Sequence, residues 1–252
     1  MSFILANSLV IIPTYNEKEN IYRMVRTVFS MDASFHVLVV DDGSPDGTAQ
    51  IVKTLQVEYP ESLFLLERAG KQGLGTVYIA VFKGGLGRPH QYTTEMDAVF
   101  PHNPHDLPRL RNACTEQNAD VVVGSRYVKG GQLQNWPWDR VMLSYGASWY
   151  VRCITWMPVK DPTAGFVCYR RAVLETLDLD KIRFVGYAFQ IEMKYAARLL
   201  GFKIVEIPIT FSDRLEGNSK MSKSIVREAI WGVLLMRWRS FFVNYAADSS
   251  LA

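Results

Sequence analysis

The chain has 252 residues, of which 48% are hydrophobic and 21% charged, and its formal net charge at pH 7 is +3. This composition is typical of a globular domain and excludes a disordered chain, while the small net charge does not indicate a nucleic-acid partner. The sequence shows no secretory leader and no uncharged apolar stretch of about 18 residues, the length needed to span a membrane.

The first predicted unit consists of a strand, a helix and a second strand. Leu9–Ile12 and Val37–Val40 are uninterrupted apolar runs, which are typical of strands buried on both faces of a parallel sheet. Apolar residues at helical spacing between positions 21 and 28 predict the intervening helix, with Asn16 as its cap and Glu19 completing a capping-box pattern. This order of elements predicts a right-handed βαβ unit.

Two carboxylates follow the second strand directly. Asp41 and Asp42 precede the turn formers of Gly43–Gly47, so the strand must end at the aspartates. Ligands of open α/β sheets bind beyond the carboxyl ends of the strands, which makes both side chains candidate ligand contacts. A single aspartate at such a position is, however, more often a helix cap than a ligand.

The rest of the chain alternates between strands and helices. Strands are predicted at Leu63–Leu66, Tyr92–Asp97, Val121–Val123, near Val167 and at Lys203–Ile209. Helices are predicted from about residue 47 and over residues 106–117, 140–157, 186–200 and 224–245. No repeat, low-complexity tract or linker interrupts this order. We therefore expect one α/β domain with a mostly parallel, twisted sheet flanked by helices.

A glycine-containing loop, Lys71–Thr76, precedes a further helical segment. It lacks the Gly-Lys-Ser/Thr of a P-loop and the G-x-G-x-x-G of a dinucleotide site. Its glycines predict a backbone turn that passes close to a ligand or a neighbouring strand, and an ordinary tight loop before a helix is the equal alternative.

Charged residues gather where strands end. Asp97 and Arg126 follow the strands at 92–97 and 121–123, and the polar loop 214–223 carries Arg214 and Lys220. Carboxylates bind Mg²⁺ or Mn²⁺ and guanidinium groups bind phosphate, so this combination predicts a ligand that bears phosphates and a divalent metal. Each feature is weak alone, because a basic loop is usually a solvated surface. Their convergence at one sheet edge carries the prediction.

Ordered motifs along the chain resemble those of a known family. Pro13–Glu17, Val40–Thr48 and Gly124–Tyr127 are similar to motifs of family 2 glycosyltransferases, which have the GT-A fold. The closer resemblance is to the polyprenyl-phosphate mannosyltransferases, the dolichol-phosphate mannose synthase group. Supporting motifs are Lys71–Thr76, Asn135–Pro137, Asp161–Phe166, Gln190–Met193 and Gly217–Ser222. The resemblance implies a GT-A domain with a Rossmann-like nucleotide-binding half over residues 1–223, and a C-terminal amphipathic helix and tail over residues 224–252.

The resemblance also implies roles for individual residues. The pocket for the nucleotide, usually GDP, is matched by Pro13, Tyr15, Glu17, Val40, Asp41, Asp42 and Lys71. The metal motif begins at Asp97 and Ala98, and Arg126 matches a contact to the pyrophosphate or the acceptor phosphate. The lipid phosphate is matched by Arg140 and Ser144. The loop that closes over the phosphates is matched by Arg214 and Lys220, and the expected catalytic set is Asp97, Arg126, Arg214 and Lys220.

Two further polar residues, Gln190 and Glu192, lie on the helix predicted at 186–200. Glu192 could position the sugar hydroxyls, and a structural anchor on a half-buried helix is the equal alternative. By resemblance, Gln190–Met193 together with Asn135–Pro137 favours mannose as the transferred sugar.

One stretch departs from the pattern that the resemblance implies. The metal motif would read Asp-Ala-Asp, but Val99 replaces the second aspartate and cannot ligate a metal. Pro101 stands where a further oxygen or amide ligand is common. Asp97 alone suffices for a Mg²⁺ ion that keeps most of its waters, since Mg²⁺ needs only one or two protein carboxylates. A weakened site in an altered family member is the alternative.

The resemblance implies an inverting transferase that moves mannose from GDP-mannose to a polyprenyl phosphate, dolichyl or undecaprenyl, with Mg²⁺ or Mn²⁺ as cofactor. The acceptor phosphate is already an anion at pH 7, so the reaction needs no strong general base. Two alternatives stay open. One is transfer of another sugar, glucose or an aminosugar, and the other is a nucleotide-sugar-binding protein without turnover, which Val99 motivates.

The C-terminal region is basic and rich in aromatic residues. Over residues 214–239, basic side chains outnumber acidic ones, and Trp231 and Trp238 are interleaved with them. Such a helix is suited to an anionic membrane surface, and a helix packed on the core is the equal alternative. The scattered Cys114, Cys153 and Cys168 favour a reducing compartment. We expect a cytoplasmic enzyme, peripheral at the cytoplasmic face of a membrane, with an anchoring partner protein as an open question and no nucleic-acid partner.

Overall fold

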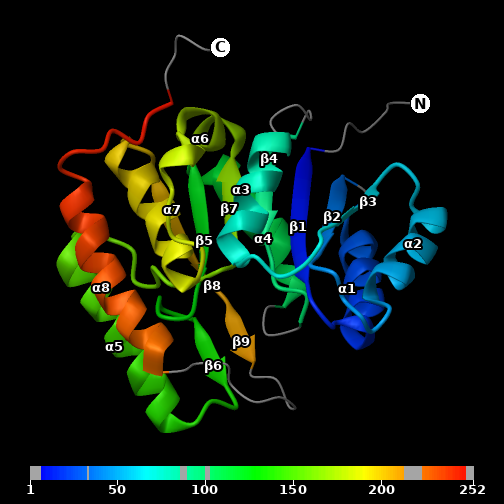
Figure 1. Ribbon diagram of the computed structural model, residues 1–252, viewed down its shortest axis with the longest axis horizontal. Coiled ribbons are helices and arrows are strands. Elements are labelled where there is room, and N and C mark those ends of the chain that lie inside the picture. The colour runs from blue at the N-terminus through cyan, green and yellow to red at the C-terminus, as the bar shows by residue number, and fades with distance from the viewer. Residues whose placement is uncertain (1–6, 33, 86–89, 100–102, 213–222, 248–252) are drawn as a thin grey trace.

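A seven-stranded sheet forms the centre of the molecule in the order β3-β2-β1-β4-β7-β5-β8. The computed structural model describes residues 7–32, 34–85, 90–99, 103–212 and 223–247 (Figure 1). The strands of this sheet are β1 (Ser8–Thr14), β2 (Phe35–Asp41), β3 (Leu63–Glu67), β4 (Tyr92–Glu95), β5 (Val121–Ser125), β7 (Val167–Arg170) and β8 (Ile204–Pro208). Only β7 runs antiparallel to its neighbours in this sheet, so the prediction of a mostly parallel sheet is confirmed.

Helices cover both faces of the sheet (Figure 1). They are α1 (Lys18–Met31), α2 (Thr48–Glu58), α3 (Leu74–Gly85), α4 (Leu107–Glu116), α5 (Trp138–Thr155), α6 (Arg171–Thr176), α7 (Tyr187–Leu199) and α8 (Lys223–Arg239). Side chains alternate along each strand, so Val10 and Ile12 pack in the core beside α1, while Leu9 and Ile11 pack in the core that includes α3 and α7. The apolar runs are therefore buried on both sides, as predicted.

A third layer lies outside α7, where α5 and α8 lie side by side (Figure 1). Val233 and Met236 of α8 are buried against Ile191 and Tyr195 of α7, and Val151 of α5 joins the same cluster. The C-terminal helix is therefore packed on the core through one part of its surface. In the part of the chain that the structure describes, no helix is both long and apolar enough to cross a membrane.

The predicted capping box at the start of α1 is wrong. Asn16 adopts a left-handed φ of 58°, and the helix begins after Glu17 without a side-chain cap of its own. The loop after β2 supplies the acceptors instead. Ser44 Oγ accepts from the N–H of Asn16 at 2.9 Å, Thr48 Oγ1 accepts from that of Glu17 at 3.0 Å, and Asp46 Oδ2 accepts from that of residue 18 at 3.1 Å. A tertiary contact thus replaces the local one.

The second half of the chain differs from the prediction in three places. The strand predicted at 203–209 ends at Pro208, and β9 (Thr210–Ser212) follows it and pairs in parallel with β6 (Gln132–Gln134). Helix α6 was not predicted. The final helix ends at Arg239, and the chain then returns to α6, where the N–H of Asp178 donates to the carbonyl of Tyr245 at 2.8 Å. Cys114, Cys153 and Cys168 are free thiols.

Gly131, between β5 and β6, provides a test of this packing. A Cβ at Gly131 would lie 2.6 Å from the carbonyl oxygen of Arg126, whereas one at Gly146 in α5 would meet nothing within 4 Å. We expect Gly131→Ala to lower the free energy of unfolding by about 1–3 kcal/mol, because backbone must shift. Gly146→Ala, the matched control, should raise it by about 0.5–1 kcal/mol. Urea unfolding measures both, and equal effects of the two changes would contradict the packing.

Candidate active site

Asp41 braces the turn after β2. Its side chain is 1% exposed, and Oδ1 accepts from Thr14 Oγ1 at 3.0 Å and from Ser44 Oγ at 2.6 Å. The other oxygen, Oδ2, accepts from the N–H of Ser44 at 2.8 Å. Both oxygens are therefore used within the protein, and Asp41 fixes the loop that in turn caps α1.

Three of the residues predicted at the nucleotide pocket lie together. The ammonium of Lys71 lies 4.6 Å from the ring centroid of Tyr15, whose side chain is exposed. Burial raises the pKa of Asp42, while the positive charges of Arg68 and Lys71 act in the opposite direction. Arg68, which the sequence did not single out, places its Nε 3.2 Å from Asp42 Oδ1. The group combines an aromatic face, a carboxylate and two cations.

The other residues predicted for this pocket surround the same loop. Pro13 of β1 is the register partner of Val40 in β2. The Val40 side chain is fully buried in the core, so only its backbone can meet a ligand. Glu17 accepts from the side chain of Asn20 at 2.9 Å. That any of these residues contacts a nucleotide stays a prediction.

Arg126 is held by a buried carboxylate at the end of β5. Its Nε lies 2.7 Å from Asp161 Oδ2 and its second terminal nitrogen 2.6 Å from Asp161 Oδ1, a bidentate pair. The same guanidinium donates to Thr163 Oγ1 at 3.0 Å. Burial acts to raise the pKa of Asp161, but the charge and hydrogen bonds of Arg126 outweigh it and leave that pKa below its usual value.

Aromatic rings connect Arg126 with the two residues predicted at the acceptor phosphate. The guanidinium carbon of Arg126 lies 5.8 Å from the ring centroid of Trp136, and that of Arg140 lies 4.0 Å from the same ring. Tyr127, 5.2 Å from Arg126, donates its hydroxyl to Ser144 Oγ at 2.7 Å. The structure thus brings Arg126, Arg140 and Ser144 into one neighbourhood.

Asp97 lies half-buried just beyond β4, where its charge acts on the pKa of Arg126. Val99 is buried at 5% exposure, and Pro101 lies outside the described residues. Within the described ranges no three histidine, cysteine or acidic side chains come together as a metal cage. An ion that takes Asp97 as its protein carboxylate and fills its other positions with water and substrate phosphate is compatible with these described residues.

Behind Asp97 lies a buried polar network that the sequence did not reveal. Gln190 Nε2 donates to Glu95 Oε2 at 2.6 Å, and Lys194 donates to Gln190 Oε1 at 3.3 Å and to the carbonyl of Ala164 at 2.8 Å. Glu95 and Lys194 are both fully buried. Burial raises the pKa of Glu95 to about 8 and lowers that of Lys194 to about 8, while each charge favours the ionised form of the other.

Glu192 is enclosed by protein groups. Its Oε2 accepts from the N–H groups of Arg183 and Phe184 at 2.8 and 3.0 Å, and its Oε1 accepts from Tyr245 at 3.2 Å and from Arg239 at 3.3 Å. Burial raises its pKa. These contacts tie α7 to α8 and to the C-terminal segment, which favours the anchoring alternative for Glu192. Gln190 is likewise engaged in the network described above.

Arg214 and Lys220 lie outside the described residues. The strand before them, β9, ends at Ser212, whose Oγ donates to Gln134 Oε1 at 3.1 Å. Phe211 of β9 lies 5.4 Å from the guanidinium carbon of Arg126. The chain therefore reaches the start of the predicted closing loop close to Arg126.

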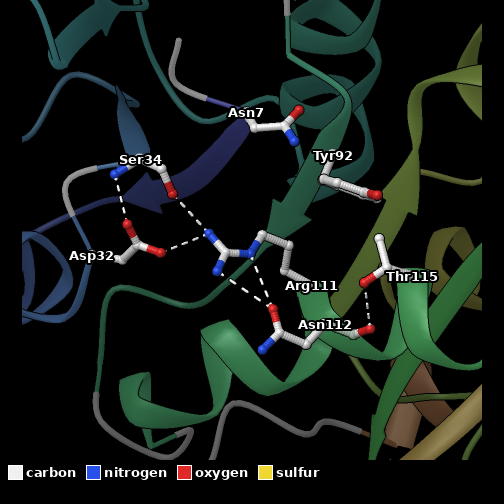
Figure 2. A pocket seen from close by; sticks show the side chains of 7 residues that line it. All are labelled: Asn7, Asp32, Ser34, Tyr92, Arg111, Asn112 and Thr115. Atoms are coloured by element: carbon white, nitrogen blue, oxygen red, sulfur yellow. Dashed lines mark hydrogen bonds and ion pairs between the residues drawn. The ribbon is translucent and has the colours of Figure 1, made fainter. Parts of the chain in front are cut away.

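A hollow of about 490 Å³ lies at the opposite, amino-terminal edge of the sheet (Figure 2). Arg111 crosses it and donates to Asp32 Oδ2 at 2.8 Å and to Ser34 Oγ at 2.7 Å. The remaining lining residues are Asn7, Tyr92, Asn112 and Thr115. The charged groups here pair with each other, and the strand ends that carry Asp42 and Asp97 lie at the other edge. We therefore place the candidate site at the carboxyl ends of the strands.

Comparisons with known proteins show the family to which the chain belongs. Residues 9–178 match the family model described as glycosyl transferase family 2. Polyprenol monophosphomannose synthase of Mycolicibacterium smegmatis is 46% identical over 231 residues, which cover 90% of this chain and 87% of that protein. Undecaprenyl-phosphate mannosyltransferase of Micrococcus luteus is 45% identical over 235 residues, 91% of this chain and 95% of that protein.

Solved structures share the fold at lower identity. A mannosyltransferase from Pyrobaculum calidifontis in complex with GDP-Man and Mn²⁺ has a TM-score of 0.60 at 16% identity, with 96% of this chain and 66% of that chain covered. Glucosyl-3-phosphoglycerate synthase from Mycobacterium tuberculosis with phosphoglyceric acid has a TM-score of 0.67 at 15% identity, with 92% and 80% covered.

The buried network gives a stability prediction. We expect Lys194→Met to lower the free energy of unfolding by about 3 kcal/mol, because the buried oxygens of Gln190 and Ala164 lose their charged donor. Glu95→Gln should lower it by no more than about 1 kcal/mol, because a pKa of about 8 leaves the Glu95 carboxyl mostly protonated at pH 7. The double variant should lose less than the sum, since both side chains contact Gln190 in one hydrogen-bond network. Urea unfolding at pH 7 measures the cycle. Lys53→Met, which removes an exposed pair with Glu67, is the control and should cost no more than about 1 kcal/mol. Strict additivity would contradict the coupling.

Proposed function

The chain belongs to glycosyl transferase family 2, and we propose that this glycosyltransferase moves mannose from GDP-mannose onto a polyprenyl phosphate. The observation that carries the proposal is the meeting of two groups at one sheet edge. On one side Tyr15, Asp42 and Lys71 lie together, and on the other Arg126 and Arg140 lie against the ring of Trp136. We assign the first group to the nucleotide and the second to an anionic acceptor. The relatives named for mannose transfer to lipid phosphates support the choice of sugar and acceptor.

On the donor side, the aromatic face of Tyr15 would hold the guanine base and Asp42 the ribose hydroxyls. Lys71 and Arg68 lie close enough to Asp42 to affect its pKa, so positive charge is present beside the pocket for the donor's phosphates. For Arg214 and Lys220 we propose the role of neutralising the departing GDP as its charge develops.

On the acceptor side, a phosphate oxygen of the lipid attacks the anomeric carbon of mannose, and the bond from that carbon to the GDP oxygen breaks with inversion. No general base is required, because the attacking oxygen is already ionised at pH 7. The task left to the protein is alignment, which we assign to Arg126, Arg140 and Ser144. The buried Asp161 fixes Arg126 for this task.

A divalent cation, Mg²⁺ or Mn²⁺, fits the proposal as an ion held by Asp97, by water and by the donor's phosphates. When bound it supplies positive charge to the leaving group. The fold relative from Pyrobaculum calidifontis was solved with GDP-Man and Mn²⁺, which supports a metal of this kind. Because Val99 offers no oxygen, we propose that the affinity for the ion is low.

We further propose that the enzyme works at a membrane surface. Large apolar side chains are exposed on α5 and α8, which lie side by side (Figure 1). They are Met142, Leu143, Tyr145 and Trp149 on α5, and Trp231, Leu234, Leu235 and Trp238 on α8. Arg237 of α8 lies 5.0 Å from the ring of Trp156, a further exposed aromatic side chain at the end of α5, so positive charge is present beside these two helices. Apolar side chains with nearby cations suit the interface of an anionic membrane, where a lipid acceptor resides.

The first test is transfer itself. Purified protein with GDP-mannose, a short polyprenyl phosphate and Mn²⁺ should form lipid-linked mannose, and a chelator should abolish the product. Val99→Asp should lower the Mn²⁺ concentration needed for half-maximal rate about tenfold or more, because it adds a carboxylate ligand. Val57→Asp, at an exposed position of α2, is the control. Paramagnetic resonance of Mn²⁺ with GDP and protein reads the same change without turnover.

The same assay separates the alternatives. A faster reaction with a UDP-glucose or UDP-aminosugar donor would overturn the choice of mannose. Binding of GDP-mannose without product, in both the natural chain and Val99→Asp, would overturn the assignment as a working transferase in favour of a binding protein.

Membrane association has its own test. Substituting Trp149, Trp231 and Trp238 together by serine should reduce the fraction of protein that sediments with phosphatidylglycerol vesicles at least about tenfold, because each indole loses apolar area that the interface would bury. The matched control is Val57→Ser on α2, which is 82% exposed. Equal sedimentation of the triple variant and Val57→Ser would contradict the proposal that α5 and α8 bind the membrane.

A further inference from the structure

Trp136 is the point at which two arginines of the acceptor side meet. The guanidinium carbon of Arg140 lies 4.0 Å from the centroid of its ring, and that of Arg126 lies 5.8 Å from it. Asp161 already balances the charge of Arg126, so the ring adds a second favourable contact for that guanidinium group and one for Arg140. The negative face of an indole ring attracts a guanidinium group, and indole is the strongest such partner among the aromatic side chains.

The backbone holds Trp136 in this position. Asn135 adopts a left-handed φ of 62°, a conformation that asparagine tolerates better than most residues. Pro137 follows with φ of −59° and serves as the N-cap of α5. The ring of Phe211 packs edge-on against the indole at 5.5 Å and 89°. The Asn-Trp-Pro sequence is therefore a rigid turn that presents one ring, and β9 supports it from the side.

The indole N–H gives a second, independent observation. Trp136 Nε1 is buried and finds no hydrogen-bond acceptor among the described residues. A buried donor without a partner costs free energy of folding, so its presence calls for an explanation. The charged groups known to contact this ring are donors as well. An anion bound beside Trp136 would accept the hydrogen bond that the indole N–H cannot make within the described protein.

We propose that Trp136 organises the acceptor-phosphate site: its ring positions Arg126 and Arg140, and its N–H donates to the phosphate of the lipid. The assignment rests on the proposed function. It also gives a role to the Asn135–Pro137 motif, whose tryptophan contacts Arg126, Arg140 and Phe211.

Two substitutions separate the two roles. Trp136→Phe keeps an aromatic ring and removes the N–H, and we expect it to raise KM for farnesyl phosphate about threefold to tenfold. Trp136→Leu removes ring and donor, and we expect a rise of about thirtyfold or more, since both arginines lose their shared partner. In both variants KM for GDP-mannose should stay within about twofold of the natural chain. Calorimetric titration with farnesyl phosphate should show the same order of affinities without turnover.

The control removes an aromatic ring beneath an arginine elsewhere. Tyr22→Leu acts on α1, where Arg26 lies 5.2 Å from the ring, and it should leave both KM values unchanged. Thermal unfolding of each variant reports whether it folds. If Trp136→Leu does not fold, Trp136→Phe alone still tests the role of the indole N–H.

The outcomes are distinct. A KM for GDP-mannose that rises as much as that for farnesyl phosphate would overturn the assignment to the acceptor. If Trp136→Phe leaves KM for farnesyl phosphate unchanged, the N–H does not donate to the phosphate. If Trp136→Leu leaves it unchanged, the ring does not position the arginines. Failure of the proposed function looks different, because the natural chain itself would then neither transfer mannose nor bind farnesyl phosphate.

Discussion

The buried ion pair between Arg126 and Asp161 is the interaction on which the acceptor side of the molecule depends. Asp161 is fully buried, and removing two charges from water is costly unless good geometry offsets it. Here the pair is bidentate, and Glu206 of β8 accepts from the N–H groups of Lys160 and Asp161 at 2.7 and 2.9 Å. The pair therefore joins the end of β5 to the loop before β7 and to β8. The pair fixes the position of the Arg126 guanidinium group, against which the rings of Trp136 and Phe211 pack.

The donor side depends on contacts between two loops, the one after β2 and the one between β1 and α1. The turn after β2 is braced by Asp41 and lends its hydroxyl and carboxylate groups to the start of α1. Tyr15 lies between the end of β1 and that start. Its position is therefore set by residues some thirty positions later in the chain, in accordance with the separations of these bonds (28 and 31 residues). The two adjacent carboxylates therefore have different contacts. Asp41 holds the turn after β2, whereas Asp42 lies beside Arg68 and Lys71.

The sequence predicted the regular part of the fold, because strands buried on both faces leave long apolar runs such as Val37–Val40. It missed β6 and β9, whose short polar segments pair only because the chain brings them together. At the site, Asp42, Lys71 and Arg126 could be proposed from their places at strand and loop ends. Glu95 and Lys194 could not, since neither the polar strand Tyr92–Glu95 nor the mixed helix Tyr187–Leu199 shows in its sequence that these charged side chains are buried or which partner they have. The capping box at Asn16 failed for a related reason, because a tertiary acceptor outcompeted a local one.

The place of β7 has a consequence for how the protein is made. This strand runs between β4 and β5, antiparallel to both, although it follows them in the chain. While the chain is being synthesised, β4 has β1 on one side and no partner on the other until residues 167–170 have emerged. An open strand edge invites pairing with other chains, and such non-local pairings form slowly. The half built from β1, β2 and β3 has local connections and can form early. The centre of the sheet stays incomplete until β7 is added, so the risk of misassembly during synthesis is concentrated at the free edge of β4.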